Sequence, residues 1–350
     1  MRLKLVSSNS GPTFVQATEP SLADRTVGCS WMDTSATPGL LKAWTGSLWV
    51  ILDYTDTVIS GFGYDTGQRT SSPTSRVDKL TFKTESISSL VSSILHGNTE
   101  MGSCSSDYKG FFCGGWNTST AYSNVNSLVF FNDSISTVTS NTQHSFFDCA
   151  SVDSSAAGYF GAIALALGSY YNYIDKLSFS GETTSSLAST LTLARYSGAG
   201  TESDTKGFVS GGYYSGGVTN QTDKITFATD ATAAATSGLA QIRYIPFGVS
   251  SSANGYIGGG SSTGGVSPLT SIDRLVFASE TDSLITSGLP TALVGPAGCY
   301  SPDAGYQCAG RLAGGSGVST VTRLLYSNES VAAVTSTLTI TGYYGTATEC

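Results

Sequence analysis

The chain has 350 residues, of which 40% are hydrophobic and only 12% are charged, and its formal net charge is −8. A chain of this length buries roughly three quarters of its unfolded surface, so a large apolar core is expected. The negative charge and the lack of a Lys/Arg cluster exclude nucleic acid and anionic membranes from the predicted partners, and no apolar run is long enough to span a bilayer.

The first 52 residues are rich in tryptophan and do not follow the pattern of the rest of the chain. Three of the four tryptophans, Trp31, Trp44 and Trp49, lie here, around turn-forming stretches at 35–39 and 45–47. This pattern predicts two or three short strands joined by those turns. We expect residues 1–52 to form a small β module. No apolar segment typical of a secretory signal occurs in residues 1–10.

Positions 20–50 contain, in order, Trp-x-Asp-Thr-Ser, a proline, Leu-Lys, an aromatic residue, a glycine and a closing Trp-Val. This residue pattern resembles a short module of bacteriophage, notably cyanophage, tail-fibre and other virion proteins. Cys29 departs from the module, which usually has an acid after the glycine. The resemblance implies attachment to a virion through this segment. The residues it assigns to attachment are Trp31, Asp33, Lys42, Trp44 and Trp49.

From residue 53 onward, one unit recurs about six times. Its first marker is a Leu or Ile two residues before an aromatic residue, usually just after an acid and a base, and the markers are 48 to 50 residues apart. The marker residues are Leu80, Leu128, Leu177, Ile225, Leu275 and Leu324. Within each block apolar and polar residues alternate with period 2, which predicts strands with one packed face.

A Gly-aromatic dipeptide precedes five of these markers by 18 to 20 residues, as in Gly255-Tyr256. Several of the dipeptides run into a glycine pair such as Gly114-Gly115. A period near 50 residues with an apolar strand that ends in Gly-Gly is typical of propeller repeats. The repeat resembles the kelch repeat, from which it departs by lacking the usual downstream tryptophan. We expect the glycines to lie where neighbouring backbones approach closely, rather than to bind phosphate.

The predicted fold is all-β: a six-bladed kelch-like β-propeller over residues 53–350, preceded by the N-terminal module. One blade is expected to contain four strands, at 247–252, 255–260, 271–278 and 283–287. The segment 341–346 matches only the innermost strand of a further unit. We therefore predict that the C-terminal strand pairs with residues 57–62, completes the first blade and closes the ring.

Seven cysteines are scattered along the chain, and two pairs recur at the same spacing, Cys104/Cys113 and Cys299/Cys308. This spacing places each pair opposite one another across the hairpin of two inner strands. Buried thiols are expected rather than disulfides, because no export signal is present. Whether the pairs are oxidised stays open.

No catalytic residue, metal site or cofactor is predicted. The two histidines, His96 and His144, occupy equivalent repeat positions, which favours a structural origin over metal binding. The repeated acids Asp78, Asp175, Asp223 and Asp273 each precede a base, so we interpret them as cross-strand or turn partners. A carbohydrate-active enzyme with paired carboxylates on the propeller face remains an alternative.

The connections between second and third strands vary in length and contain many of the tyrosines. In a propeller these loops emerge on one face, and tyrosine combines an apolar ring with a hydroxyl that suits glycan or protein recognition. The alternative is that these rings only pack the loops onto the blades. The candidates for receptor or glycan binding are Tyr64, Tyr122, Tyr170, Tyr171, Tyr173, Tyr213 and Tyr214.

The expected function is therefore non-enzymatic. The resemblance implies a structural protein of a virion, such as a tail-fibre, baseplate or decoration protein, made in the host cytoplasm. Its expected partners are other virion proteins and a glycan or protein of the host surface, and association with further copies of the chain stays open. A purely architectural virion subunit is the second alternative beside the enzyme.

Overall fold

The structure is a computed structural model of the chain and describes residues 14–16, 21, 30–33, 40–44, 49–52, 61–70, 72–130, 132–265 and 267–350. The described residues form strands, turns and bridges, and they contain no helix that could cross a membrane. Two compact units divide the chain at Gly61/Phe62, whereas the predicted boundary was at 52/53.

The first unit contains one four-stranded sheet in the order β1-β2-β3-β4. The strands are β1 (Phe14–Gln16), β2 (Ser30–Asp33), β3 (Leu40–Trp44) and β4 (Trp49–Leu52). β1 is parallel to β2, while β2, β3 and β4 form an antiparallel meander. The meander matches the two or three predicted strands, and β1 was not predicted. The predicted turns lie outside the described residues.

The second unit is a β-propeller of six four-stranded blades, as predicted. Blade 1 contains, from the axis outward, β30 (Thr346–Glu349), β5 (Phe62–Thr66), β6 (Val77–Thr81) and β7 (Ser86–Ser89). Blade 2 contains β8 (Gly102–Ser105), β9 (Lys109–Cys113), β10 (Val125–Val129) and β11 (Ser134–Thr137). Blade 3 contains β12 (Ala150–Asp153), β13 (Ala157–Gly161), β14 (Asp175–Ser178) and β15 (Thr183–Ser186).

The remaining blades follow in chain order. Blade 4 contains β16 (Ala199–Glu202), β17 (Lys206–Ser210), β20 (Thr222–Thr226) and β21 (Ala231–Ala234), with a small hairpin of β18 (Tyr213–Tyr214) and β19 (Gly217–Val218). Blade 5 contains β22 (Phe247–Ser250), β23 (Asn254–Gly258), β24 (Ile272–Val276) and β25 (Thr281–Leu284), close to the predicted strands. Blade 6 contains β26 (Ala297–Tyr300), β27 (Ala304–Arg311), β28 (Gly317–Leu325) and β29 (Val331–Ala333).

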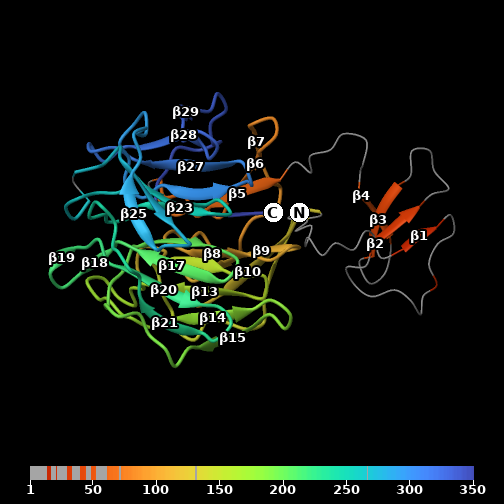
Figure 1. Ribbon diagram of the computed structural model, residues 1–350, viewed down its shortest axis with the longest axis horizontal. Helices are drawn as coiled ribbons and strands as arrows, with labels where there is room; N and C mark the ends of the chain where they lie inside the picture. Colours follow the sequence, from red (N-terminus) through yellow and green to blue (C-terminus); the bar gives the residue numbers. More distant parts are fainter. Residues whose placement is uncertain are drawn as a thin grey trace. The chain divides into compact units, whose positions relative to one another are not determined.

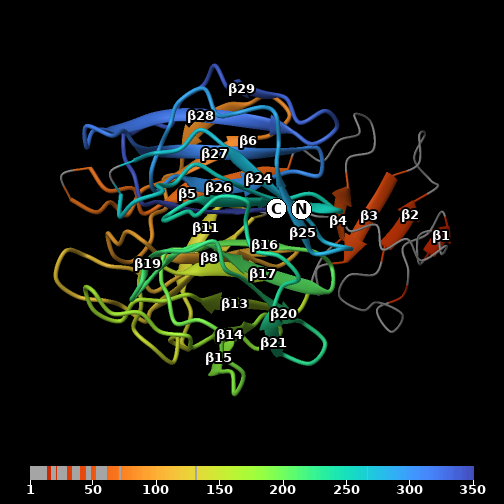
Figure 2. The same cartoon turned by 60° about the vertical axis from the view of Figure 1, so that its left-hand side comes forward.

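The C-terminal strand closes the ring, as predicted. β30 pairs antiparallel with β5, and Thr346 faces Thr66. Figures 1 and 2 show the orange strand β5 beside the blue strands of the last blade. The predicted segments, 341–346 and 57–62, were each placed about five residues too early. The reason is that Gly63-Tyr64 is the Gly-aromatic dipeptide of blade 1, and Gly63 faces Leu80 in the same register as Gly255 faces Leu275.

The two sequence markers meet at every interface between blades. The aromatic residue of each second strand stacks on the aromatic residue that follows the third strand of the next blade, with centroids 5.1 to 5.5 Å apart. The six pairs are Tyr64/Phe130, Phe111/Phe179, Tyr159/Phe227, Phe208/Phe277, Tyr256/Tyr326 and Tyr306/Phe82. Six apolar clusters, one at each interface, surround these pairs. The core is therefore divided among the interfaces.

The glycine of each Gly-aromatic dipeptide lies where neighbouring blades approach closely. A Cβ atom on Gly158 would overlap the side chain of Cys104 in the preceding blade, and one on Gly305 would overlap that of Val249. The glycine pairs have a different reason. Gly114 and Gly115 have φ angles of 68° and 99°, a left-handed conformation that favours glycine. The glycine pairs are thus favoured by two things: the predicted close approach of a neighbouring backbone, and a left-handed backbone conformation.

The repeated acids of the third strands hold the connections between blades. The backbone N–H of His144 donates to Asp175 (2.9 Å), and that of Thr339 donates to Asp78 (2.7 Å). The same interaction recurs at Asp223 and Asp273. These carboxylates are at most 5% exposed, so an unpaired amide beside them would be costly. Their role is structural, as predicted, but their partners lie in the connections between blades rather than across the strands or in the turns.

The bases that follow these acids, and Arg323 at the equivalent position after Thr322, form ion pairs with the next blade. Each acceptor is an acid with a positive φ in the turn between third and fourth strands. The pairs are Lys79–Asp133, Lys176–Asp230, Lys224–Glu280, Arg274–Glu329 and Arg323–Glu85. Lys109 supplies the cation for Glu182, because blade 2 has no base at this position. Since these pairs are partly exposed, each contributes little beyond orientation.

The cysteines of the described residues are free thiols, and five of the six are buried. The prediction that each recurring pair lies directly opposite across a hairpin is wrong. Cys104 faces Phe111 and Cys113 faces Gly102, so the two thiols are offset by two residues along the ladder. Cys299 and Cys308 have the same offset. Cys29 lies outside the described residues.

A substitution at Gly200 tests how tightly the inner strands of neighbouring blades are packed. A Cβ atom there would overlap the carbonyl oxygen of Ser151, whereas one on Gly314 would meet no atom within 4 Å. We expect Gly200→Ala to lower the free energy of unfolding by about 1–3 kcal/mol, because backbone must move to accommodate the methyl group. Gly314→Ala is the matched control and should unfold at the same denaturant concentration as the wild type. Equal midpoints for both variants in urea would contradict the packing described.

Candidate binding site at the channel mouth

The predicted tyrosines do not all lie in loops. Tyr64 is wrong as a receptor-binding candidate, because it lies within β5, is fully buried and donates its hydroxyl to Asp133 (2.8 Å). The remaining predicted tyrosines are on connections between second and third strands and are at least partly accessible. These are Tyr122, Tyr170, Tyr171, Tyr173, Tyr213 and Tyr214. Their partial exposure leaves binding by them a prediction.

These connections and the connections between blades emerge on one side of the propeller, which we call the loop face. The opposite turn face carries the short turns between first and second strands and between third and fourth strands. On the loop face, His144 stacks on Tyr173 (4.7 Å between centroids), and His96 stacks on Tyr122 (5.0 Å). Tyr173 is 38% exposed. The histidines therefore support the tyrosine loops.

Of the attachment candidates, Trp31 and Asp33 lie in β2, Lys42 and Trp44 in β3, and Trp49 in β4. In the backbone register Trp31 faces Lys42, and Trp44 faces Trp49. The sheet thus brings four of the five candidates together as neighbouring pairs.

A closed ring of six backbone hydrogen bonds surrounds the propeller axis on the loop face. One residue of each blade-to-blade connection donates its N–H to the carbonyl of its counterpart in the preceding connection, at 2.7 to 3.1 Å. The ring consists of Glu100, Asp148, Ser197, Ile245, Gly295 and Tyr344. All six have φ angles between 52° and 65°. The shared conformation places one side chain from each connection, glycine excepted, around the axis.

The ring forms the mouth of a channel along the axis. The channel has a cavity volume of about 130 Å³ and is lined by the six ring residues and by residues of the six innermost strands. Carboxylates lie at both ends: Glu100 and Asp148 at the loop face, and Asp153, Glu202 and Glu349 at the ends of innermost strands near the turn face. No Lys, Arg or His is among the lining residues. The channel is therefore acidic.

The two carboxyl groups at the mouth are costly to ionise. Burial raises the pKa of Glu100 well above its usual value, and the nearby Asp148 raises it further, while Arg69 offsets part of the rise. Burial also raises the pKa of Asp148 to about 7, and the Ser197 hydroxyl offsets part of that rise. Glu100 and Asp148 are neighbours in the ring, since the Asp148 N–H donates to the Glu100 carbonyl (2.9 Å). Ionisation of both carboxyl groups at once is therefore unfavourable unless a cation is present.

An aromatic collar surrounds this mouth. Its members immediately precede ring residues or lie in the loop bridged to them: Trp116, Phe147, Tyr196, Tyr213, Tyr244 and Tyr343, together with the ring residue Tyr344. Adjacent members are in contact: the ring centroids of Trp116 and Phe147 are 4.8 Å apart, and those of Tyr213 and Tyr244 are 5.6 Å apart. Arg311 lies over Tyr343 and Tyr344 at 5.7 and 5.5 Å. The collar gives the mouth an apolar rim.

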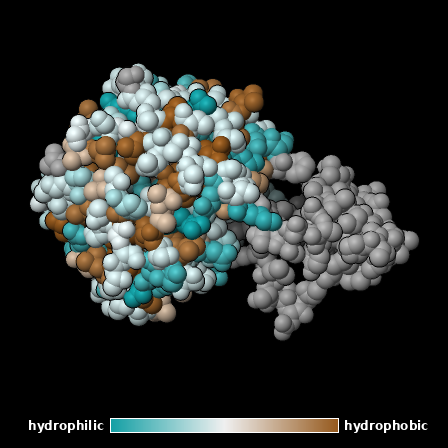
Figure 3. Space-filling view, turned by 90° about the horizontal axis from the view of Figure 1, so that it is seen from above, coloured by the Kyte–Doolittle hydropathy of each residue, from teal (hydrophilic) through white to brown (hydrophobic). Residues whose placement is uncertain are grey.

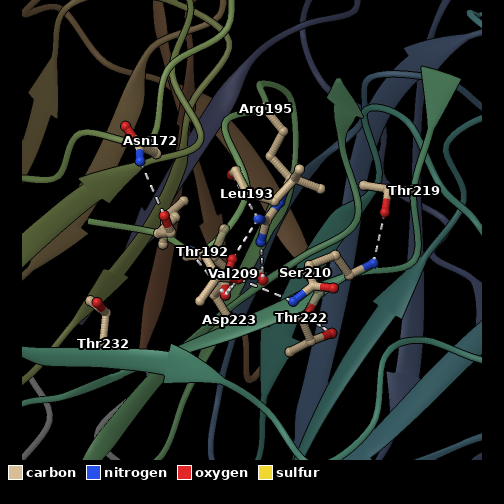
Figure 4. A network of polar contacts seen from close by, with 12 residues as sticks. Asn172, Thr192, Leu193, Arg195, Val209, Ser210, Thr219, Thr222, Asp223 and Thr232 are labelled. Carbon is tan, nitrogen blue, oxygen red and sulfur yellow. Dashed lines mark hydrogen bonds and ion pairs between the residues drawn. The ribbon is translucent and has the colours of Figure 1, made fainter. Parts of the chain in front are cut away.

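Two fully buried arginines hold the collar segments in place. Arg195 donates to the carbonyl oxygens of Val209 and Gly211, both at 2.8 Å, and pairs with Asp223 at 2.5 Å (Figure 4). Arg243 makes the equivalent contacts with Gly259 and Asp273 in blade 5. Each arginine immediately precedes a collar tyrosine, Tyr196 or Tyr244. Buried charge pairs of this kind fix geometry, because loss of one partner leaves the other uncompensated.

Sequence reasoning missed most of this site. It considered the connections within blades, whereas Glu100, Asp148, Tyr196, Tyr244 and Tyr344 lie on connections between blades. The usable signal was their position: each follows an outer strand and precedes an innermost strand by one to three residues. In the described ranges, no three His, Cys, Asp or Glu side chains are grouped so as to hold a metal ion.

Comparison with known proteins gives no relative from which a function could be transferred. No protein-family model matches the chain, and no curated protein matches it. Figure 3 shows apolar residues in separate patches among polar ones on one view of the propeller. The geometry of the channel mouth is therefore the main basis for a functional proposal.

The raised pKa of Asp148 predicts that this residue lowers the free energy of unfolding in a pH-dependent way. An aspartate of pKa about 7 in the folded state and about 3.8 when unfolded destabilises the fold above pH 4, and most strongly above pH 7. We expect Asp148→Asn to increase the free energy of unfolding by about 1–2 kcal/mol at pH 8 and to lose this advantage towards pH 4. Asp107→Asn, at an exposed turn-face position, is the control. A gain that does not change with pH in urea titrations would refute this assignment.

Proposed function

We propose that this protein is a non-enzymatic structural protein of a virion, such as a tail-fibre, baseplate or decoration protein, which uses its loop face to attach to a host surface. The N-terminal unit would join other virion proteins, and the propeller would present the loop face to a host glycan or protein. The observation that carries the attachment role is the aromatic collar around an acidic channel mouth.

The chemistry of the loop face supports binding. Tyrosine and tryptophan rings provide contact area at a low cost in conformational entropy, and their polar atoms orient a ligand. The collar stands on a rigid base, because the ring of backbone hydrogen bonds joins all six blades and buried arginines anchor two of the collar segments. A preorganised surface loses less entropy when it binds. The viral setting is supported by the residue pattern of positions 20–50.

A second candidate is a carbohydrate-active enzyme, which the Glu100–Asp148 pair favours. Glycoside hydrolysis uses two carboxyl groups, one of which has a raised pKa. The pKa values of Glu100 and Asp148 are both raised. Release of reducing sugar from host polysaccharide, lost in Glu100→Gln, would support the enzyme in place of the attachment protein.

Electron cryomicroscopy of virus particles tests the location of the chain. The proposal expects a six-bladed ring in the particle density with its loop face directed outward. A loop face buried between subunits would instead support a purely architectural role. Absence of the 36.1 kDa chain from the particle would overturn the viral proposal.

Attachment itself is tested with purified, fluorescently labelled protein on host cells. We expect replacement of both Tyr173 and Tyr213 by alanine to weaken binding at least tenfold, or about 1.4 kcal/mol, since aromatic contacts dominate such interfaces. Tyr108→Ala is the matched control, because Tyr108 is 53% exposed in a turn of the opposite face. Equal loss in the control, or full binding by the double variant, would count against attachment through the loop face.

A further inference from the structure

The two ends of the axial channel differ in how their carboxylates are partnered. At the turn-face end, Asp153 accepts a hydrogen bond from the Ser105 amide (2.8 Å), and Glu202 accepts one from a tyrosine hydroxyl. At the loop-face end, neither Glu100 nor Asp148 forms an ion pair within the described part of the chain; the Ser197 hydroxyl acts on Asp148, and the charge of Arg69 acts on Glu100. The mouth therefore holds two neighbouring carboxyl groups that form no ion pair with a described residue.

The third consecutive member of the ring adds an unused polar group. Ser197 lines the channel and is only 3% exposed, yet its hydroxyl has no hydrogen-bond partner in the structure. It lies near enough to stabilise the Asp148 carboxylate, without forming a hydrogen bond of normal geometry. A buried hydroxyl without a partner costs free energy. Two carboxylates and one hydroxyl thus converge on the mouth with capacity to accept hydrogen bonds.

Tyrosine rings surround these acceptors. Burial is the largest cause of the raised pKa of Tyr196, Tyr244 and Tyr344, and Asp148 adds to each rise, so all three tyrosines lie near its carboxyl group. Tyr196 and Tyr244 meet edge to face, with an angle of 87° between their planes and 5.7 Å between centroids. The rings form a corner rather than a closed stack. Aromatic faces combined with carboxylates are the usual environment for an organic ammonium group.

The size of the cavity limits what enters it. The cavity volume of about 130 Å³ is similar to that of an apolar cavity of roughly 150 Å³ that accepts a benzene molecule. Because this volume extends along the channel from the loop-face ring to the turn-face ends of the innermost strands, the mouth itself has room for a small cationic head group rather than for a complete sugar ring. The rest of a ligand would have to lie outside, on the collar. The nearest cations do not fill the site, because Arg311 lies over Tyr343 and Tyr344, and Arg69 is not among the lining residues.

We propose that the channel mouth binds the ammonium group of an amino sugar in a host-surface glycan, with Glu100, Asp148 and Ser197 accepting its hydrogen bonds and the collar tyrosines contacting the sugar ring. This inference rests on the attachment role proposed above and specifies its ligand. A sugar is favoured over a lysine side chain because the collar offers several rings beyond the cavity, which a pyranose covers and an alkyl chain does not. Arg69, whose charge reaches Glu100, opposes the ligand.

Isothermal titration calorimetry with the full chain tests the inference. The probes are a glucosamine trimer and its N-acetylated counterpart, which differ only in the charge and acetylation of the amino groups. We expect the amine trimer to bind at least tenfold more tightly. The Glu100→Gln/Asp148→Asn variant should lose this preference, and Arg69→Gln should strengthen it. Gln and Asn suit these positions, because the φ angles of 60° and 52° are tolerated by amide side chains.

The charge-matched control is Asp107→Asn/Asp204→Asn, which removes two exposed acids from turns of the turn face and should leave the preference intact. Equal binding of the two trimers, or a preference that survives in Glu100→Gln/Asp148→Asn, would overturn the inference. Equally tight binding of a lysine tripeptide would overturn the choice of an amino sugar. If host-cell attachment occurs without an amine preference, only this inference fails; if an amine preference occurs without attachment, the proposed function fails instead.

Discussion

The propeller depends on aromatic stacking between blades. One ring from each second strand stacks on the ring that follows the third strand of the next blade. This stacking occurs once at each of the six interfaces, within 0.4 Å of the same centroid distance. The glycine before each second-strand ring lets the preceding inner strand approach. Such a pair contributes about 0.5–1.5 kcal/mol beyond its buried area, so six of them distribute stability evenly around the ring.

The connections around the propeller axis are held together by backbone hydrogen bonds rather than by aromatic stacking. Six backbone hydrogen bonds link the blade connections and require a left-handed conformation at six positions. Only one of the six is glycine, so five side chains are held around the mouth at some conformational cost. Two of these are carboxyl groups close together, which adds an electrostatic cost. Features that reduce stability without an evident structural benefit are typical of functional sites.

The sequence predicted the blade count and the ring closure because the markers of each interface recur with little variation. It misplaced Tyr64 because the Gly-aromatic dipeptide of blade 1 lies 17 residues before Leu80, just outside the spacing of the other five. It missed Glu100 and Asp148 because their importance arises only when connections distant in sequence meet at the axis. Residue type alone did not distinguish them from ordinary surface acids, whereas ring geometry and burial do.

The closing pair of strands joins residues that are far apart in sequence, since Thr66 and Thr346 are separated by 280 positions. Blade 1 therefore lacks its innermost strand until residues 346–349 have been synthesised, while the other five blades are built from continuous segments. Contacts between such distant residues slow folding. During synthesis the inner edge of β5 stays unpaired, and pairing with another chain at this edge is the route by which a nascent propeller would misassemble.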